Sequence, residues 1–253
     1  MHHVLAPSLK QNRAVNCRSY RENAGFNQYI TLGDRAIRGN INSTLASYSG
    51  LLDNLTSHYA SLEDAKKHSL KKSAFSYTGK EGRCPVCKGA GRLKVSMDFM
   101  DDVWNDCYRC KGRRYNDKVL HIRDKDLNIA DSLQLTVYEA YSRFNNITGR
   151  KGEMFNNTLK QLIETGLGHL VLGQGIETLS AGESQRLNLS LKLLEDKGEK
   201  TLYMLDEPAT GLFYPDIDKL ISVFNRLVDE GHTVMFIEHN PYLISVANQV
   251  VEM

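Results

Sequence analysis

The stretch that decides the fold is TLYMLDEP, residues 201–208. It begins with a short, mostly apolar run, which indicates a buried strand. The run ends in the carboxylates Asp206 and Glu207, and Pro208 then favours a turn. The stretch therefore predicts a strand that delivers two acidic side chains to its carboxyl end.

A second apolar run, TVMFI at residues 233–237, ends in the polar residues EHN at positions 238–240. Between the two runs, Pro215 begins and Gly231 ends a helical pattern of apolar residues. Strands separated by helices of this length are typical of a parallel α/β sheet, in which ligands bind at the carboxyl ends of the strands. We therefore expect both sets of polar side chains at one edge of a sheet.

Upstream of these strands lies the segment LSAGESQR, residues 179–186. Ser180 followed by Glu183 predicts a capping box that begins a helix. The amino end of a helix presents backbone N–H groups and the positive end of its dipole, which suits a phosphate. Taken singly, this segment, the Asp-Glu turn and His239 are each compatible with an ordinary cap, turn or loop residue.

Taken together, the order of these segments resembles that of ABC-type ATPases, with a signature segment, a Walker B strand and a switch histidine. By this resemblance, the residues that bind ATP and Mg²⁺ are Ser180, Gly182, Glu183 and Asp206. The resemblance also implies two catalytic residues: Glu207 would polarise the attacking water, and His239 would contact the γ-phosphate.

The Walker A pattern G-x-x-x-x-G-K-[ST], whose loop cradles nucleotide phosphates, does not occur in the 253 residues. Met1 falls just after the expected Walker A helix, and Met253 falls before the glycine-rich segment that normally follows. We therefore expect a chain truncated at both ends, for which ATP hydrolysis without another chain stays an open question.

The cysteines follow the spacing Cys84-x2-Cys87-x19-Cys107-x2-Cys110, and each pair is followed by Lys-Gly. Four thiolates match tetrahedral Zn²⁺, and a closed four-ligand shell indicates a structural rather than a catalytic metal. The alternatives are two disulfides or a redox pair, which the duplicated arrangement and a reducing compartment disfavour. Cys17 stands alone, and we interpret it as an inert thiol.

Residues 63–126, which contain these cysteines, hold 16 Lys and Arg against 10 Asp and Glu. Such a segment, interleaved with Phe99, Trp104, Tyr108 and Tyr115, can bind a phosphate backbone. A solvated basic face around a structural metal is the alternative, and composition leaves both open.

The zinc and ABC motifs together resemble the second half of the UvrA family, the damage-sensing ATPase subunit of the bacterial UvrABC excinuclease. The resemblance rests on the 19-residue spacing within the cysteine segment and on stretches such as CKGRRYN (110–116), LDEPATGL (205–212) and IEHN (237–240). It implies dimerisation, double-stranded DNA and a UvrB-like protein as partners, and a second copy or another chain that supplies the Walker A loop. Ala181, Phe213 and Arg35 depart from the residues that the family carries at these positions.

The expected fold is therefore an α/β, partial ABC-type nucleotide-binding domain, with a parallel sheet, flanking helices, a helical signature subdomain and an inserted four-cysteine zinc module. We expect four segments: an ABC-core remnant at 1–62, the basic zinc-binding insertion at 63–126, the signature subdomain at 127–195 and the Walker B and switch-histidine core at 196–253. A UvrA-like drug-resistance paralogue and a non-hydrolysing, zinc-dependent DNA-binding fragment remain alternatives to a repair ATPase. No apolar stretch approaches the roughly 20 residues that cross a bilayer, so we expect a cytoplasmic protein without a membrane partner.

Overall fold

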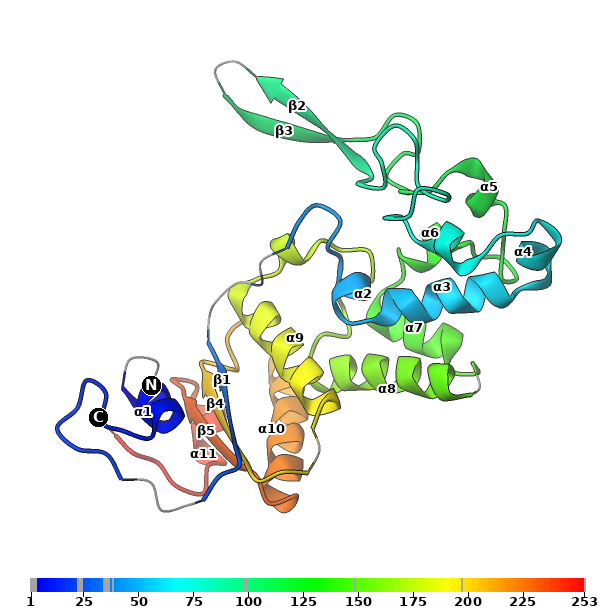
Figure 1. Cartoon of the computed structure of the whole chain (residues 1–253). Helices are drawn as coiled ribbons and strands as arrows, with labels where there is room; N and C mark the ends of the chain where they lie inside the picture. Colours follow the sequence, from blue (N-terminus) through cyan, green and yellow to red (C-terminus); the bar gives the residue numbers. More distant parts are fainter. Residues whose placement is uncertain are drawn as a thin grey trace. The chain divides into compact units, whose positions relative to one another are not determined.

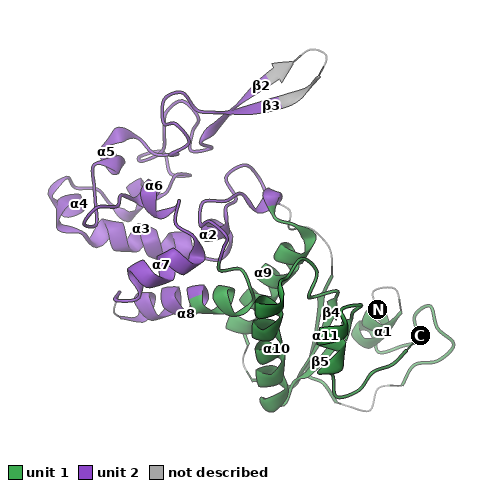
Figure 2. Cartoon of the chain, turned by 180° about the vertical axis from the view of Figure 1, so that it is seen from behind, with its two compact units in different colours: residues 1–37, 160–168, 179–253 green, residues 38–159, 169–178 purple. Residues whose placement is uncertain are grey.

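A computed structural model of the chain describes residues 4–21, 25–33, 37, 39–97, 100–147, 149–196 and 198–252. The chain forms two compact units, which are coloured separately in Figure 2. Unit 1 contains Met1–Ile37, Lys160–Gly168 and Leu179–Met253, and unit 2 contains Arg38–Leu159 and His169–Thr178. Each unit is described by itself below.

Unit 1 is built on a parallel sheet of three strands in the order β1-β4-β5. The strands are β1 (Gln28–Leu32), β4 (Thr201–Asp206) and β5 (Thr233–Ile237). The sheet confirms the two strands expected from the sequence and their parallel direction, and Asp206 pairs in register with Ile237. The strand β1 was not expected.

Alternate residues of β4 point to opposite faces of the sheet, as the period of a strand requires. Tyr203 and Leu205 pack in one core cluster with residues of α9 (Ala181–Leu194), α10 (Tyr214–Asp229) and α11 (Pro241–Ser245). Leu202 and Met204 pack in a second cluster with α1 (Leu5–Gln11). Figure 1 shows the sheet between α1 on one side and α9 and α10 on the other, and both faces of its central strand are buried.

Unit 2 is mostly helical and contains an antiparallel hairpin of β2 (Arg92–Met97) and β3 (Met100–Asp106). Before the hairpin come α2 (Leu45–Tyr48), α3 (Leu51–Ser61), α4 (Glu63–Lys67) and the 3₁₀ turn η1 (Lys72–Phe75). After it come α5 (Asp117–Leu120), α6 (Ile129–Ser132), α7 (Val137–Phe144), α8 (Arg150–Glu164) and the 3₁₀ turn η2 (Ile176–Thr178). In the sequence, Leu51, Leu52 and Leu55 predict a helix with these residues on one side, and α3 confirms it.

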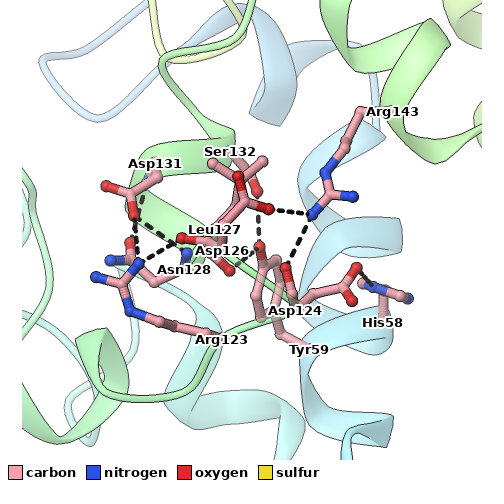
Figure 3. A network of polar contacts seen from close by, with 10 residues as sticks. All are labelled: His58, Tyr59, Arg123, Asp124, Asp126, Leu127, Asn128, Asp131, Ser132 and Arg143. Atoms are coloured by element: carbon pink, nitrogen blue, oxygen red, sulfur yellow. Dashed lines mark hydrogen bonds and ion pairs between the residues drawn. The ribbon is translucent and has the colours of Figure 1, made fainter.

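A polar network, drawn in Figure 3, fixes the segment 122–128 to the helices of unit 2. The buried hydroxyl of Tyr59 donates to the carbonyl of Leu127 at 3.0 Å and lies 2.7 Å from the hydroxyl of Ser132. Arg143 donates to the Asp124 carbonyl at 3.0 Å and, at 2.7 Å, to the Asp126 carboxylate. This network anchors the chain that leaves the cysteine segment to α3, α6 and α7.

Among the described residues, the helices are all too short or too polar to cross a membrane.

Candidate functional site

Four cysteine thiols in unit 2 form a cluster with the geometry of a metal centre. The Sγ atoms of Cys84, Cys87, Cys107 and Cys110 all lie within 4.8 Å of one another, and all four residues are buried. The pairs Cys84–Cys107 and Cys87–Cys110 have Sγ–Sγ distances of 3.9 and 3.6 Å. These distances exceed the roughly 2 Å of a disulfide bond and suit four sulfur ligands around one ion.

The two cysteine pairs lie in turns with the same backbone conformation. Lys88 and Lys111 have φ of 54° and 49°, and the glycines that follow them have φ of 91° and 79°. A Cβ atom on Gly89 would lie 1.8 Å from the carbonyl oxygen of Tyr77, so the turn requires glycine there. The backbone N–H of Gly91 donates to the Sγ of Cys87 at 3.3 Å, which helps to stabilise a thiolate.

The second turn departs from the first at Arg114, which occupies the position of Gly91. Arg114 keeps the left-handed backbone of a glycine, with φ of 68°. Its guanidinium donates to the carbonyl of Gly89 at 3.2 Å and lies over the ring of Tyr77, 5.0 Å from its centre. The arginine therefore ties the second turn to the first.

The thiols have different affinities for protons. Burial acts to raise the pKa of Cys107, but hydrogen bonds from the backbone N–H groups of Cys110 and Arg109, with those from neighbouring thiols, lower this pKa to about 7. Burial raises the pKa of Cys87 and of Cys110. A metal ion is the group that would allow all four to ionise together, since metal ligation deprotonates thiols.

Unit 1 has a cavity of about 550 Å³, and unit 2 has one of about 460 Å³. The cavity in unit 2 lies beside the cysteine cluster, and its cationic lining comprises Arg92, Lys111, Arg113 and Arg114. Asp106 and Asp131 contribute carboxylates to the same lining. Next to it, Tyr108 is 75% exposed and Trp104 is 46% exposed. Cations and exposed aromatic rings therefore gather around the candidate metal centre.

In unit 1, the expected capping box at the start of α9 is confirmed. The hydroxyl of Ser180 accepts the N–H of Glu183 at 3.2 Å, and the Glu183 carboxylate accepts the N–H of Ser180 at 2.8 Å. The first turn of α9 packs on the chain that follows β4, because Arg186 donates to the Thr210 carbonyl at 3.0 Å. The amino end of α9 is thus held beside the acidic turn.

The acidic turn and the histidine meet at the carboxyl edge of the sheet. Glu207 has φ of 48°, and its N–H donates to the carbonyl of Ile237 at 2.9 Å. Its carboxylate accepts the hydroxyl of Thr210 at 3.1 Å and lies 4.0 Å from Nε2 of His239. Both side chains are well exposed to solvent, so the edge is open to a ligand.

Three further residues organise this edge: Glu238 was expected there as part of EHN, whereas Gln185 and Arg186 were not predicted to lie at it. Glu238 accepts the N–H groups of Ala209 at 3.0 Å and His239 at 2.7 Å, which joins the two loops that follow β4 and β5. Gln185 donates to the carbonyl of Leu32 at 3.0 Å, and Arg186 makes the contact to Thr210 described above. The sequence signal for Glu238 is its position directly after the second apolar run. Arg35 lies outside the described residues.

Comparison with known proteins gives a consistent result, although no family model matches the chain. A protein named UvrABC system protein A from Borreliella burgdorferi is 37% identical over 259 residues, which cover 100% of this chain and 27% of that protein. The protein of the same name from Clostridium acetobutylicum is 44% identical over 211 residues, 83% of this chain and 22% of its own. The crystal structure of UvrA2 from Deinococcus radiodurans matches with a TM-score of 0.81 and 34% identity, covering 95% of this chain and 29% of that one.

The chain thus spans about a quarter of the length of these curated relatives. The matches include the cysteine segment and the strands and helices of unit 1, because the first alignment covers the whole chain. From this similarity in sequence and in structure, the chain belongs to the UvrA family.

Proposed function

We propose that the chain is part of a UvrA-like, damage-recognising ATPase subunit of nucleotide excision repair. One observation carries this proposal: the chain is 37% identical along its whole length to a UvrABC system protein A. The four clustered thiols and the open carboxyl edge of the sheet support it, since they supply a metal centre and a ligand-binding edge of matching chemistry.

At the edge of unit 1, we assign nucleotide chemistry to five side chains and one glycine. Asp206 would hold Mg²⁺, directly or through water, while Glu207 would polarise the attacking water and His239 would contact the γ-phosphate. Ser180, Gly182 and Glu183, at the amino end of α9, would bind phosphate oxygens through N–H groups and the Ser180 hydroxyl. The exposure of Glu207 and His239 supports these roles, because a substrate can reach both.

The nucleotide site would be composite. A second copy or another chain would contribute a phosphate-cradling loop of the kind whose G-x-x-x-x-G-K-[ST] pattern these 253 residues lack. The proposed division into an ABC core (1–62 and 196–253), a zinc insertion (63–126) and a signature subdomain (127–195) follows from the same assignment.

In unit 2, Cys84, Cys87, Cys107 and Cys110 would hold one structural Zn²⁺. Zinc would fix the two turns and thereby position the cations around the neighbouring cavity. We assign this surface to double-stranded DNA, because Lys111 and Arg113 line the cavity and can neutralise backbone phosphates. Arg92, in the same lining, pairs with Glu177 at 2.8 Å. A UvrB-like protein would be the further partner.

Duplex binding by the purified, zinc-loaded chain tests this assignment. We expect affinity to fall steeply with salt. The double variant Lys111→Ala/Arg113→Ala should weaken binding. It should also reduce the slope of log affinity against log salt concentration by about 1 for each phosphate that it no longer neutralises. Lys67→Ala is the matched control, since it removes a cation from the same basic segment away from the cavity. Equal effects of the control and the double variant would reject this surface.

A second candidate function is a non-hydrolysing, zinc-dependent DNA-binding module, which the clustered thiols and the cationic lining of the neighbouring cavity favour. Measured turnover of Mg-ATP by the chain alone would exclude this candidate. DNA binding that a chelator abolishes, without any turnover, would support it and would exclude independent ATPase activity. A drug-resistance paralogue would be distinguished by equal affinity for damaged and undamaged duplexes.

A further inference from the structure

A second group of metal-ligating side chains lies in unit 1, away from the proposed nucleotide edge. Asp196, Glu230 and His232 each offer one ligand atom, and these atoms lie within 4.8 Å of one another. Asp196 follows α9, Glu230 is the C-cap of α10, and His232 precedes β5. The group lies at the start of β4, because Thr201, the first residue of that strand, contacts His232. Asp206, at the nucleotide edge, is the last residue of the same strand. At about 3.3 Å per residue, the group therefore lies roughly 17 Å from the nucleotide edge.

Carboxylates outnumber cations at this place. Helices α9 and α10 both end here, and the carboxyl end of a helix carries a partial negative charge. The residues that cap these ends are Glu195 and Glu230, which have the wrong sign for that dipole. Lys192, in the last turn of α9, lines the same cavity and pairs with Glu195 at 2.7 Å, which offsets one of these charges. Asp196 adds a third carboxylate, and it is largely buried, with 15% of its side chain exposed.

The hydrogen bonds of His232 determine which atoms can bind an ion. The N–H of Thr201 donates to Nδ1 of His232 at 3.3 Å, so Nδ1 is an acceptor and the proton of the neutral ring lies on Nε2. Nε2 lies 3.1 Å from Oδ2 of Asp196 and donates to it. The ring therefore orients Asp196 and keeps no lone pair for a metal, which leaves carboxylate oxygens as ligands. The other oxygen of Asp196, Oδ1, accepts the N–H of Gly198 at 3.2 Å, so each oxygen keeps one lone pair for an ion.

A buried hydroxyl supplies independent support for a ligand here. The side chain of Tyr203 is fully buried, and its hydroxyl oxygen has no hydrogen-bond partner. An unsatisfied buried hydroxyl costs about 1–3 kcal/mol. Tyr203 lines a cavity of about 550 Å³ together with Glu195, Asp196 and Glu199. Its ring centre lies 5.7 Å from that of His232. Burial, followed by the charges of Asp196 and Glu230, raises the pKa of Tyr203 to about 12, so the hydroxyl stays neutral near both carboxylates.

We propose that Asp196 and Glu230 bind a hydrated, hard divalent cation such as Mg²⁺ or Mn²⁺, with Tyr203 hydrogen-bonded to a cation-bound water. Hard divalent ions take oxygen ligands, and Mg²⁺ in particular is held by one or two carboxylates while it retains several waters. The bound charge compensates the two helix ends and satisfies the Tyr203 hydroxyl. The site differs in chemistry from the cysteine cluster, whose soft thiolates select Zn²⁺.

Titration of the zinc-loaded, nucleotide-free chain with Mn²⁺, followed by electron paramagnetic resonance of the free ion, tests the site. We expect one saturable Mn²⁺ per chain, which excess Mg²⁺ displaces. Asp196→Asn and Glu230→Gln should each weaken Mn²⁺ binding by about tenfold or more, and Tyr203→Phe should weaken it by a smaller factor. Asp229→Asn is the matched control, because it removes a charge from the same end of α10 outside the group. Its affinity for Mn²⁺ should stay within about twofold of that of the wild-type chain.

Thermal unfolding provides the second measurement, which also detects variants that fail to fold. Mn²⁺ should raise the midpoint of the wild-type chain and of Asp229→Asn, but not that of Asp196→Asn, while the midpoints without Mn²⁺ should be similar. The proposal is overturned by an absence of saturable Mn²⁺ binding, or by equal loss of binding in Asp229→Asn. If His232→Ala abolishes binding and Zn²⁺ displaces Mn²⁺ from this group, the assignment to a hard cation is wrong.

Discussion

At Gly182, the signature helix packs directly on the backbone that follows β4. A Cβ atom added there would lie 2.7 Å from the carbonyl oxygen of Thr210 and 3.1 Å from a guanidinium nitrogen of Arg186. The guanidinium can move, but the Thr210 carbonyl belongs to the turn that carries Glu207. A single side-chain atom at this position therefore pushes on the proposed catalytic turn.

We predict that Gly182→Ala lowers the free energy of unfolding. Overpacking costs about 1–3 kcal/mol, whereas the gain in helix propensity is at most about 1 kcal/mol, so the loss prevails. Urea denaturation measures the change as a lower midpoint at unchanged slope. The control is Ala181→Ser, which enlarges the exposed neighbouring residue and should stay within about 0.5 kcal/mol of wild type. A midpoint for Gly182→Ala equal to or above that of wild type would show that the turn accommodates the added methyl group without loss of stability.

At the scale of the element, the two cysteine turns depend on one another for their hydrogen bonds. Cys84 donates its N–H to the carbonyl of Arg114, and Cys107 donates to that of Gly91, both at 2.8 Å. Each turn contains residues with left-handed backbone, which is an unfavourable conformation for Lys88, Lys111 and Arg114. A bound ion would offset that cost, because metal-binding free energy contributes to folding in such modules.

We predict that the purified chain contains one equivalent of Zn²⁺ and that Cys87→Ser loses it or binds it far more weakly. Three thiolates cannot close the tetrahedral shell, and the buried serine hydroxyl is a poor ligand for zinc. A chromogenic chelator after denaturation measures the stoichiometry. Cys17→Ser serves as the control and should retain full zinc, because Cys17 is exposed and outside the cluster. Zinc-free wild-type protein that unfolds at the same temperature as the zinc-loaded form would contradict a structural role.

Some helices and strands could be predicted from the sequence, and others could not. The helices α3, α9 and α10 were expected from their apolar periodicity, with end signals for α9 and α10, and each is longer than ten residues. Helices of four or five residues, such as α2 and α6, lie below the length at which local sequence stabilises a helix. The strand β1 was missed because QYITL gives little signal until it pairs with β4.

At the scale of the whole molecule, the two units are interleaved along the sequence. Unit 1 is assembled from three stretches of chain and unit 2 from two, and one boundary, at residues 159–160, falls inside α8. Among the described residues, the sheet core and the cysteine cluster belong to different units and to separate core clusters. The loss of one core therefore need not unfold the other.

We predict that chelation of the metal loosens unit 2 locally and leaves the sheet of unit 1 intact. In hydrogen exchange read by mass spectrometry, amides of residues 82–116 should exchange faster after treatment with a chelator, because their hydrogen bonds join the two cysteine turns. Amides of β4 should keep their protection from exchange. Added Zn²⁺ should restore the protection of the amides around the two cysteine turns. Simultaneous loss of protection in β4 would mean that the two units unfold as one.

The sequence by itself determined the class of the fold and predicted the chemistry of the sites. The spacing of the cysteines, the capping box at Ser180 and the two apolar runs are local patterns, and local patterns predict ligand sets, caps and strands without reference to distant residues. The parallel sheet followed from the same patterns, because a helix between two strands returns the chain in the same direction.

Only the tertiary structure decided which distant residues meet. The contact of Gly182 and Arg186 with Thr210, the two loops joined by Glu238, and the group of Asp196, Glu230 and His232 each bring together residues from separate elements. Nothing in the local sequence specifies such contacts, since they arise from the packing of α9 and α10 on a shared sheet. For the same reason, the pairing of Arg114 with the first cysteine turn became visible only when the backbone of both turns was in place.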